Sequence, residues 1–461
     1  MDESRLIDGS ARATPDPDQV SEPSASHLAL GFLIALSFVI LTRWPVARSG
    51  PVDSDEFGYL RQVQTYWFPM HHTLFLGLGR LVGILAGDLY RGFILLDMAM
   101  SAVALTASWW WLRALVGPWT AAVGTLALGV GPVFWGYGAI AGNYTAIIAV
   151  GAILLGIAYR TSARPEPWHP WAAATVLAMG TGYRQDLGTF WLPILLWILW
   201  KHRWRAALGS AALFTLLNLA WLLAMLSDVG GWDRYRSASA EFAHSAGYLN
   251  SVWNLGLVDG PLRYLVKLAM GLTWTLGPCL LFVPRGAIRV SQLEHGRVLG
   301  ALLGTSLVPP LLSHLLIHFG VPGYAFHYIP ALLALAALGA GDTAAADPRP
   351  RCDRRGAWRL GVAAALLAMA FLFYPTNYDR PGWRGSFDLA FARHTRSGLM
   401  QPTPNRQPAV WRTINSRVAQ RSDEWPTAEA PESTVRIATC NRTSGPANPR
   451  KTPANEEAAN P

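Results

Sequence analysis

The chain has 461 residues, of which 51% are hydrophobic and 15% are charged, and its formal net charge is +9. Soluble domains carry about 25% charged residues, so this composition argues against a soluble protein. The arginines concentrate in short loops between long apolar runs, a pattern that indicates membrane topology and argues against nucleic-acid binding.

The chain begins with a polar segment, residues 1–27, which is rich in Pro, Ser and Asp and is predicted to be a disordered cytoplasmic N-terminus. The first apolar run, 28–44, is predicted to be a retained signal anchor. In a bilayer such runs must be helical, because lipid offers no partners to backbone groups. The sequence therefore predicts an all-α, polytopic integral membrane protein whose transmembrane domain covers residues 28–374.

About 11 transmembrane helices are expected from runs near or above the ~18 residues that span a bilayer. After the signal anchor they are predicted at 91–113, 119–138, 143–159, 172–184, 187–200, 206–226, 263–284, 298–318, 324–341 and 358–374. A further apolar stretch, 73–87, is interrupted by three glycines and Arg80, and is predicted to be a short re-entrant or membrane-surface helix.

Orientation follows from Lys and Arg in short loops, which stay in the cytoplasm. Four such basic loops fall on one side of the predicted membrane, near 160–164, 201–205, 285–297 and 349–359. The loops 45–72 and 227–262 and the polar, partly disordered tail 375–461 are then expected on the outer face. A bacterial inner membrane is the expected location.

An acidic cluster, Asp53-Ser54-Asp55-Glu56, lies in the first outer loop. Carboxylates this close raise one another's pKa unless a cation offsets them. One of them could serve as a general base for a hydroxyl, and Asp55 with Glu56 could bind Mg²⁺ or Mn²⁺. The alternative is structural: Asp55 and Glu56 begin a helix over 55–66, where acids suit the N-terminal dipole.

Two adjacent histidines, His71 and His72, follow at the start of the next apolar stretch. Such a pair can bind a phosphate, a metal or a carboxylate partner, or it can simply be solvated at the membrane interface. His314 and His318 are one helical turn apart on a later span, which is metal-ligand spacing but is more typical of packing.

Arg184 and Asp186 lie between two short apolar segments, where charges are costly and indicate a functional site. The pair could equally neutralise itself at the interface. Tyr324 and His327 begin a late span at its outer end and are candidates to line a cavity. The sequence has no Gly-rich phosphate loop, no Gly-x-Ser-x-Gly and no His-Glu-x-x-His, so nucleotide hydrolysis and zinc proteolysis are unsupported.

The order of these motifs resembles the GT-C superfamily of membrane glycosyltransferases, which includes protein O-mannosyltransferases and bacterial aminoarabinose transferases. The resemblance covers residues 28–341. It rests on a signal anchor followed by Asp53-Ser54-Asp55-Glu56, on Phe68-Pro69-Met70-His71-His72-Thr73-Leu74-Phe75, on Pro132-Val133-Phe134-Trp135, on Asn143-Tyr144-Thr145 and on Gly323-Tyr324-Ala325-Phe326-His327-Tyr328-Ile329-Pro330-Ala331.

The resemblance implies a hexosyl or pentosyl transferase that moves a sugar, with inversion, from a polyprenyl-phosphate donor to a glycan, lipid or protein acceptor at the outer face of the membrane. Asp55 matches the family acid best, Asp53 is second, and Glu56 supports them. These acids would act as the base or hold a divalent cation, Mg²⁺ or Mn²⁺.

In the same way, Arg184 is the expected ligand of the donor phosphate. The other substrate-binding residues implied by the resemblance are His71, His72, Asp186, Tyr324 and His327. The outer loop 227–262 is expected to cap the site.

Two other functions remain open. A lipid or solute transporter or flippase would show inverted repeats and charges near the membrane midplane. An inactive GT-C-like scaffold would show the polar residues scattered. The glycosyltransferase hypothesis predicts instead that Asp53 or Asp55, the histidine pair and Arg184 converge on one outer-facing cavity that continues into a lipid-facing groove.

Overall fold

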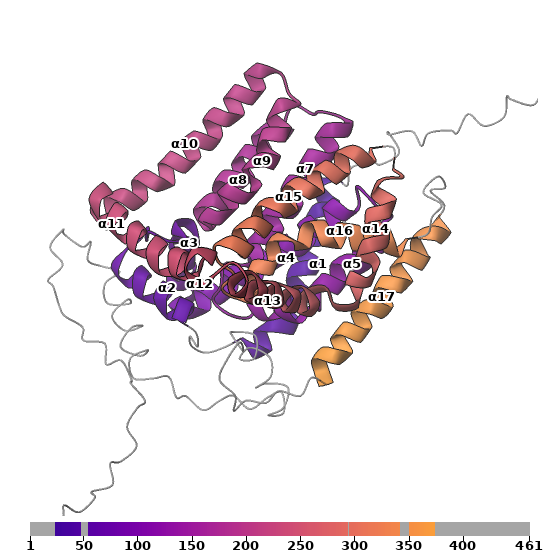
Figure 1. The fold of residues 1–461 in the computed structure, drawn as a ribbon, viewed down its shortest axis with the longest axis horizontal. Coiled ribbons are helices and arrows are strands. Elements are labelled where there is room, and N and C mark those ends of the chain that lie inside the picture. The colour runs from indigo at the N-terminus through magenta and orange to yellow at the C-terminus, as the bar shows by residue number, and fades with distance from the viewer. Residues whose placement is uncertain (1–23, 48–53, 294, 342–349, 374–461) are drawn as a thin grey trace, which may run out of the picture. The chain divides into compact units, whose positions relative to one another are not determined.

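All regular structure in the residues that the computed structural model describes, 24–47, 54–293, 295–341 and 350–373, is helical (Figure 1). The first half contains α1 (Ala25–Arg43), η3 (Trp44–Val46), α2 (Ser54–Thr65), α3 (Thr73–Ala86), α4 (Leu89–Leu112), α5 (Pro118–Gly129), α6 (Pro132–Tyr137), α7 (Thr145–Ala163), α8 (His169–Tyr183) and α9 (Gln185–Trp200). The second half contains α10 (Trp204–Val229), α11 (Trp232–Phe242), η4 (Ala243–Gly247), η5 (Tyr248–Asn250), α12 (Val252–Leu255), α13 (Asp259–Leu276), η6 (Gly277–Phe282), α14 (Val283–Val290), α15 (Gly296–Leu316), η7 (Pro322–His327), α16 (Ile329–Ala340) and α17 (Pro350–Phe373).

Each predicted span coincides with one helix or with two or three helices in succession. The run 119–138 is divided into α5 and α6 at Gly131, because Pro132 begins a new helix. Six helical segments within the described residues are long and apolar enough to cross a membrane, which supports an integral membrane protein. The predicted number of eleven spans stays a prediction.

The first helix begins earlier than expected. Ser24 is the N-cap of α1 and its side chain accepts a hydrogen bond from the His27 backbone N–H, so residues 25–27 are helical and the predicted boundary at 28 is wrong by three residues. Disorder was also predicted for the rest of the N-terminal segment and for the tail 375–461. Residues 1–23 and this tail lie outside the described part of the chain.

The core is built around α7, which packs against α4, α8, α9 and α16. Its glycines permit close helix contacts: a methyl group at Gly151 would overlap the Trp191 ring, and one at Gly156 would overlap Trp110. Small residues at helix interfaces are the usual way for membrane helices to pack, since lipid provides no hydrophobic drive between them.

A second close crossing joins α16 to the segment formed by η6 and α14. A Cβ atom at Gly339 would overlap the Phe282 carbonyl, and one at Gly286 would overlap the Leu335 carbonyl. The backbones therefore touch at this crossing, and neither glycine tolerates a side chain without a shift of the helices.

This contact predicts a stability difference between two glycine substitutions. Gly339→Ala is expected to lower the free energy of unfolding by about 1–3 kcal/mol through overpacking. The matched control is Gly304→Ala in α15, where the added methyl group meets nothing within 4 Å. Thermal unfolding in detergent compares the two, and equal midpoints for Gly339→Ala and Gly304→Ala would contradict the crossing.

Candidate functional site

Six of the predicted site residues line one cavity of about 680 Å³: Asp55, His71, His72, Arg184, Asp186 and Tyr324. They come from the first turn of α2, the start of α3, the junction of α8 and α9, and η7. Segments that are distant in sequence are therefore brought together around one space. His327 is not among the lining residues, and Asp53 lies outside the described residues.

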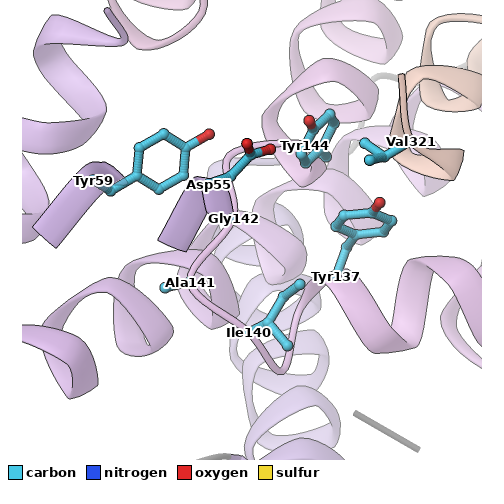
Figure 2. Close-up of a pocket in the computed structure, with 8 residues that line it drawn as sticks. All are labelled: Asp55, Tyr59, Tyr137, Ile140, Ala141, Gly142, Tyr144 and Val321. Atoms are coloured by element: carbon cyan, nitrogen blue, oxygen red, sulfur yellow. The ribbon is translucent and has the colours of Figure 1, made fainter. Parts of the chain in front are cut away.

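Asp55 occupies the first turn of α2 and its side chain is exposed. Asp55 thus lies at the start of a helix, as the structural alternative predicts, and it also lines the cavity; its role as a base stays a prediction. Figure 2 shows Asp55 between Tyr59 and Tyr144 at a smaller pocket of about 10 Å³, which is also lined by Tyr137 and Gly142. The carboxylate is therefore placed where a small molecule or water can reach it.

Glu56, the next residue, lies in the interior and is 1% exposed. Its Oε1 accepts hydrogen bonds from the Tyr90 hydroxyl at 2.8 Å and from the Ala141 backbone N–H at 3.0 Å. These contacts indicate an anchoring role. The catalytic role predicted for Glu56 stays a prediction, since this carboxylate is not among the residues that line the cavity.

A second carboxylate, Asp97 of α4, holds the same loop. Its Oδ2 accepts the Gly142 N–H at 2.5 Å and its Oδ1 accepts the Thr145 hydroxyl at 3.2 Å. Consecutive amides, those of Ala141 and Gly142, thus donate to carboxylates from two different helices. Sequence reasoning missed Asp97, although an acid inside an apolar run is a signal of function in its own right.

The anchored segment between α6 and α7 carries two residues that position Arg184. The Asn143 Oδ1 accepts from Arg184 Nη1 at 2.6 Å. The guanidinium carbon lies 4.3 Å from the centre of the Tyr144 ring and 5.2 Å from that of Tyr324, so the cation is flanked by two aromatic faces. The buried carboxylates thus hold the loop in place, and the loop in turn positions Arg184.

Arg184 also forms a two-point ion pair with Asp186. Its Nε donates to Asp186 Oδ1 at 3.0 Å and its Nη2 donates to Oδ2 at 2.8 Å. The His327 Nε2 lies 3.4 Å from the same Oδ2. The geometry agrees with the alternative in which Arg184 and Asp186 neutralise one another, and it places His327 behind Asp186 as a support.

His72 is the N-cap of α3 and has a backbone φ of 56°, the left-handed region that residues other than glycine rarely adopt. Strain of this kind costs about 1–3 kcal/mol and gathers at functional sites. The neighbouring loop is held by Gln185, whose Nε2 donates to the Met70 carbonyl at 2.9 Å. The contact connects the histidine pair to the start of α9.

Burial favours the neutral form of both histidines of the pair. Burial, and after it the Arg184 cation, lower the pKa of His72 to about 3. Burial also lowers the pKa of His71, whose ring packs against Phe242 with 4.5 Å between ring centres. They therefore offer neutral hydrogen-bonding groups to a ligand rather than positive charge.

The cavity is also lined by His314, in the last turn of α15, and by His318, which follows this helix. His314 Nδ1 lies 2.9 Å from the Tyr328 hydroxyl, a buried contact that agrees with the packing interpretation. Within the described ranges, no three His, Cys, Asp or Glu side chains are grouped as metal ligands. The predicted metal role of Asp55 and Glu56 stays a prediction.

The segment 227–262, which is predicted to be an outer loop, contributes to the cavity through Phe242 and Gly247. Its first residues are also tied to the histidine loop, because Asp228 Oδ2 accepts the Phe68 backbone N–H at 2.6 Å. The predicted cap is consistent with these contacts.

The hydrogen bonds of Glu56 allow its two roles to be separated. Glu56→Ala leaves the Ala141 N–H and the Tyr90 hydroxyl without this acceptor, at about 1–3 kcal/mol each, so thermal unfolding in detergent should occur at a clearly lower temperature. Glu56→Gln keeps an acceptor oxygen and should recover most of the stability. An anchoring role predicts that Glu56→Gln retains activity. A loss of activity in a stable Glu56→Gln protein would instead support catalysis by this residue.

No protein-family model matches the chain, and no curated protein sequence matches it. Among solved structures, ArnT from Cupriavidus metallidurans bound to undecaprenyl phosphate is similar over 86% of this chain and 75% of its own, with 13% identity and a TM-score of 0.49. The Archaeoglobus fulgidus oligosaccharyltransferase in complex with Zn and sulfate is similar over 80% of this chain, with 14% identity and a TM-score of 0.46. This chain covers 53% of that protein. These structural matches are GT-C membrane glycosyltransferases.

Proposed function

We propose that the protein is a membrane glycosyltransferase that moves a sugar from a polyprenyl-phosphate donor to an acceptor hydroxyl at the outer face of the membrane. The observation that carries this proposal is the convergence of Asp55, the histidine pair and Arg184 on one cavity. Asp55 and the histidine pair belong to motifs that resemble the GT-C superfamily, and Arg184 is the expected ligand of the donor phosphate. An inactive scaffold was instead expected to have these polar residues scattered over the molecule.

In the proposed reaction the acceptor oxygen attacks the anomeric carbon of the donor sugar. The bond between that carbon and the phosphate oxygen breaks, its electron pair stays on the phosphate, and polyprenyl phosphate leaves. The proton of the acceptor hydroxyl passes to the Asp55 carboxylate, which acts as general base. A single displacement of this kind inverts the configuration at the anomeric carbon.

The cavity also offers groups that recognise the donor. Arg184 is preorganised by Asn143 and by two tyrosine rings, and a guanidinium engages phosphate oxygens in a directional way. Because Asp186 balances the charge of Arg184, we propose that Arg184 orients the donor phosphate and does not neutralise it. The neutral His71 and His72 supply further hydrogen bonds to the phosphate or to the sugar hydroxyls.

The test is transfer in reconstituted vesicles that contain polyprenyl-phosphate sugars and candidate acceptors. Wild-type protein should form a covalently glycosylated product, and Asp55→Asn should form it at a much lower rate. A parallel sample with a chelator tests whether a divalent cation takes part. A second readout follows labelled lipid across the vesicle membrane: translocation without any glycosylated product would replace the proposal with a flippase.

A further inference from the structure

A second cavity lies in the part of the bundle formed by α1, α4 and α5, and none of its lining residues belongs to the site described above. It has a volume of about 430 Å³. Both α1 and α5 pack on α4, so α4 forms the floor of a groove whose two sides are α1 and α5. The groove is a separate binding surface of the molecule.

The groove is apolar along its length and has a basic end. Leu30, Ile34 and Phe38 of α1 face Leu105 of α4 and Leu126 of α5 across it. From His27 to Phe38 the wall extends about 16 Å, at 1.5 Å per helical residue. At the inner end a Cβ atom on Gly129 would lie 3.1 Å from the Phe38 ring, so these two residues close the groove.

The other end is marked by His27, in the first turn of α1, and by Arg113, the C-cap of α4. The Arg113 guanidinium lies 5.3 Å from the centre of the Trp109 ring, and no carboxylate of the described residues is within ion-pair distance of it. A basic end on an apolar groove between membrane helices matches the charge and shape of an anionic lipid.

The groove is far from the donor site. Arg43, the last residue of α1, lies against Gly138, in the segment that leads to the pocket of Asp55. His27 is near the other end of the same helix, about 24 Å away at 1.5 Å per residue. A lipid phosphate at Arg113 therefore belongs to the opposite leaflet from the cavity. The basic loops predict that this leaflet is the cytoplasmic one, where anionic lipids gather.

We propose that this groove binds an anionic glycerophospholipid, with one acyl chain between α1 and α5 and the phosphate at Arg113 and His27. Little of α1 is covered by protein, since only 6% of an apolar 18-residue stretch of this helix is buried. The lipid supplies packing that α1 lacks, and it holds α1 against α4 and α5.

The test uses purified, delipidated protein and native mass spectrometry, with phosphatidylglycerol and phosphatidylcholine of identical acyl chains. Wild type should bind phosphatidylglycerol about fivefold more tightly, the effect of one arginine at a membrane surface. Arg113→Gln should bind the two lipids equally. The matched control is Arg205→Gln, because Arg205 also lies over a tryptophan ring, at 5.4 Å from the Trp204 centre, but is not among the groove residues.

Variants that fill the groove test the acyl chain separately. Gly31→Leu enters from α1, where a Cβ atom meets only the Trp109 ring at 3.8 Å, and Ala122→Leu enters from α5. Either folded variant, as judged by gel filtration, should lose affinity for both lipids. The proposal is overturned if wild type has no preference for phosphatidylglycerol, if Arg113→Gln behaves like Arg205→Gln, if neither filling variant weakens binding, or if polyprenyl phosphate displaces phosphatidylglycerol at equal concentration.

Discussion

Asp55→Asn is expected to reduce sugar transfer by about 10²- to 10⁴-fold, the range for loss of a general base. The asparagine keeps the size and the hydrogen-bonding oxygen of the side chain but cannot accept the proton of the acceptor hydroxyl. Because Asp55 is exposed in the cavity and lies in the first turn of α2, the fold should be retained. Initial rates in reconstituted vesicles, at saturating donor and acceptor, measure the loss.

The chain offers a matched control for this substitution. Asp233 is also an exposed aspartate in the first turn of a helix, α11, but it is not among the cavity residues. Asp233→Asn removes the same favourable interaction with a helix dipole, worth about 0.3–1 kcal/mol, without touching the site. It should transfer sugar at the wild-type rate. If Asp55→Asn also does so while correctly folded, Asp55 is not the base.

Arg184→Met is expected to destabilise the protein by about 3–5 kcal/mol, the cost of removing one partner of a buried ion pair. Arg184 is 2% exposed, and its loss leaves the Asp186 carboxylate without its principal counter-charge. The double variant Arg184→Met with Asp186→Leu removes both charges and should recover much of that stability. Unfolding midpoints of the wild type, the two single variants and the double variant form a double-mutant cycle.

The double variant also separates two functions of the pair. If Arg184 orients the donor phosphate, the stable double variant should have a donor KM at least about tenfold higher, the loss of one charge-assisted contact of 1.4 kcal/mol or more. If the two residues only neutralise one another, the donor KM should be unchanged. Additive effects of the single substitutions on stability would show that the ion pair itself contributes little.

The helices of this protein are largely predictable because apolar runs determine them directly. The breaks within a run are harder: α5 and α6 both read as one hydrophobic segment, and only Pro132 marks the division. The early start of α1 at Ala25 depends on the Ser24 side chain, which accepts a hydrogen bond from the His27 backbone N–H. Apolar composition does not predict such a local contact. Apolar content thus predicts where helices lie better than it predicts where they end.

The site was predictable to the extent that its residues form local motifs. Asp55 and the histidine pair stand out in the sequence, and the structure brings them together in one cavity. Asp97 was missed, and Asn143 was noted only as part of a motif, because their roles arise from contacts between segments more than 40 residues apart. Asp97 accepts a hydrogen bond from an amide 45 positions away, and Asn143 accepts one from Arg184, 41 positions away. Glu56 is adjacent to Asp55 in the sequence, yet Glu56 is buried whereas Asp55 is exposed and lines the cavity.

The helix α16 has a consequence for how the protein is made. Its 12 residues span about 18 Å, less than the ~30 Å hydrocarbon core, and nearly all of them are buried by other parts of the protein. Such a helix is too short to span the bilayer by itself, and its place in the core depends on contacts with α7 and α14. Its residues are also translated after both of those helices. Closure of the core is therefore a late event in biogenesis, and a chain interrupted before residue 340 would enter the membrane with its centre open.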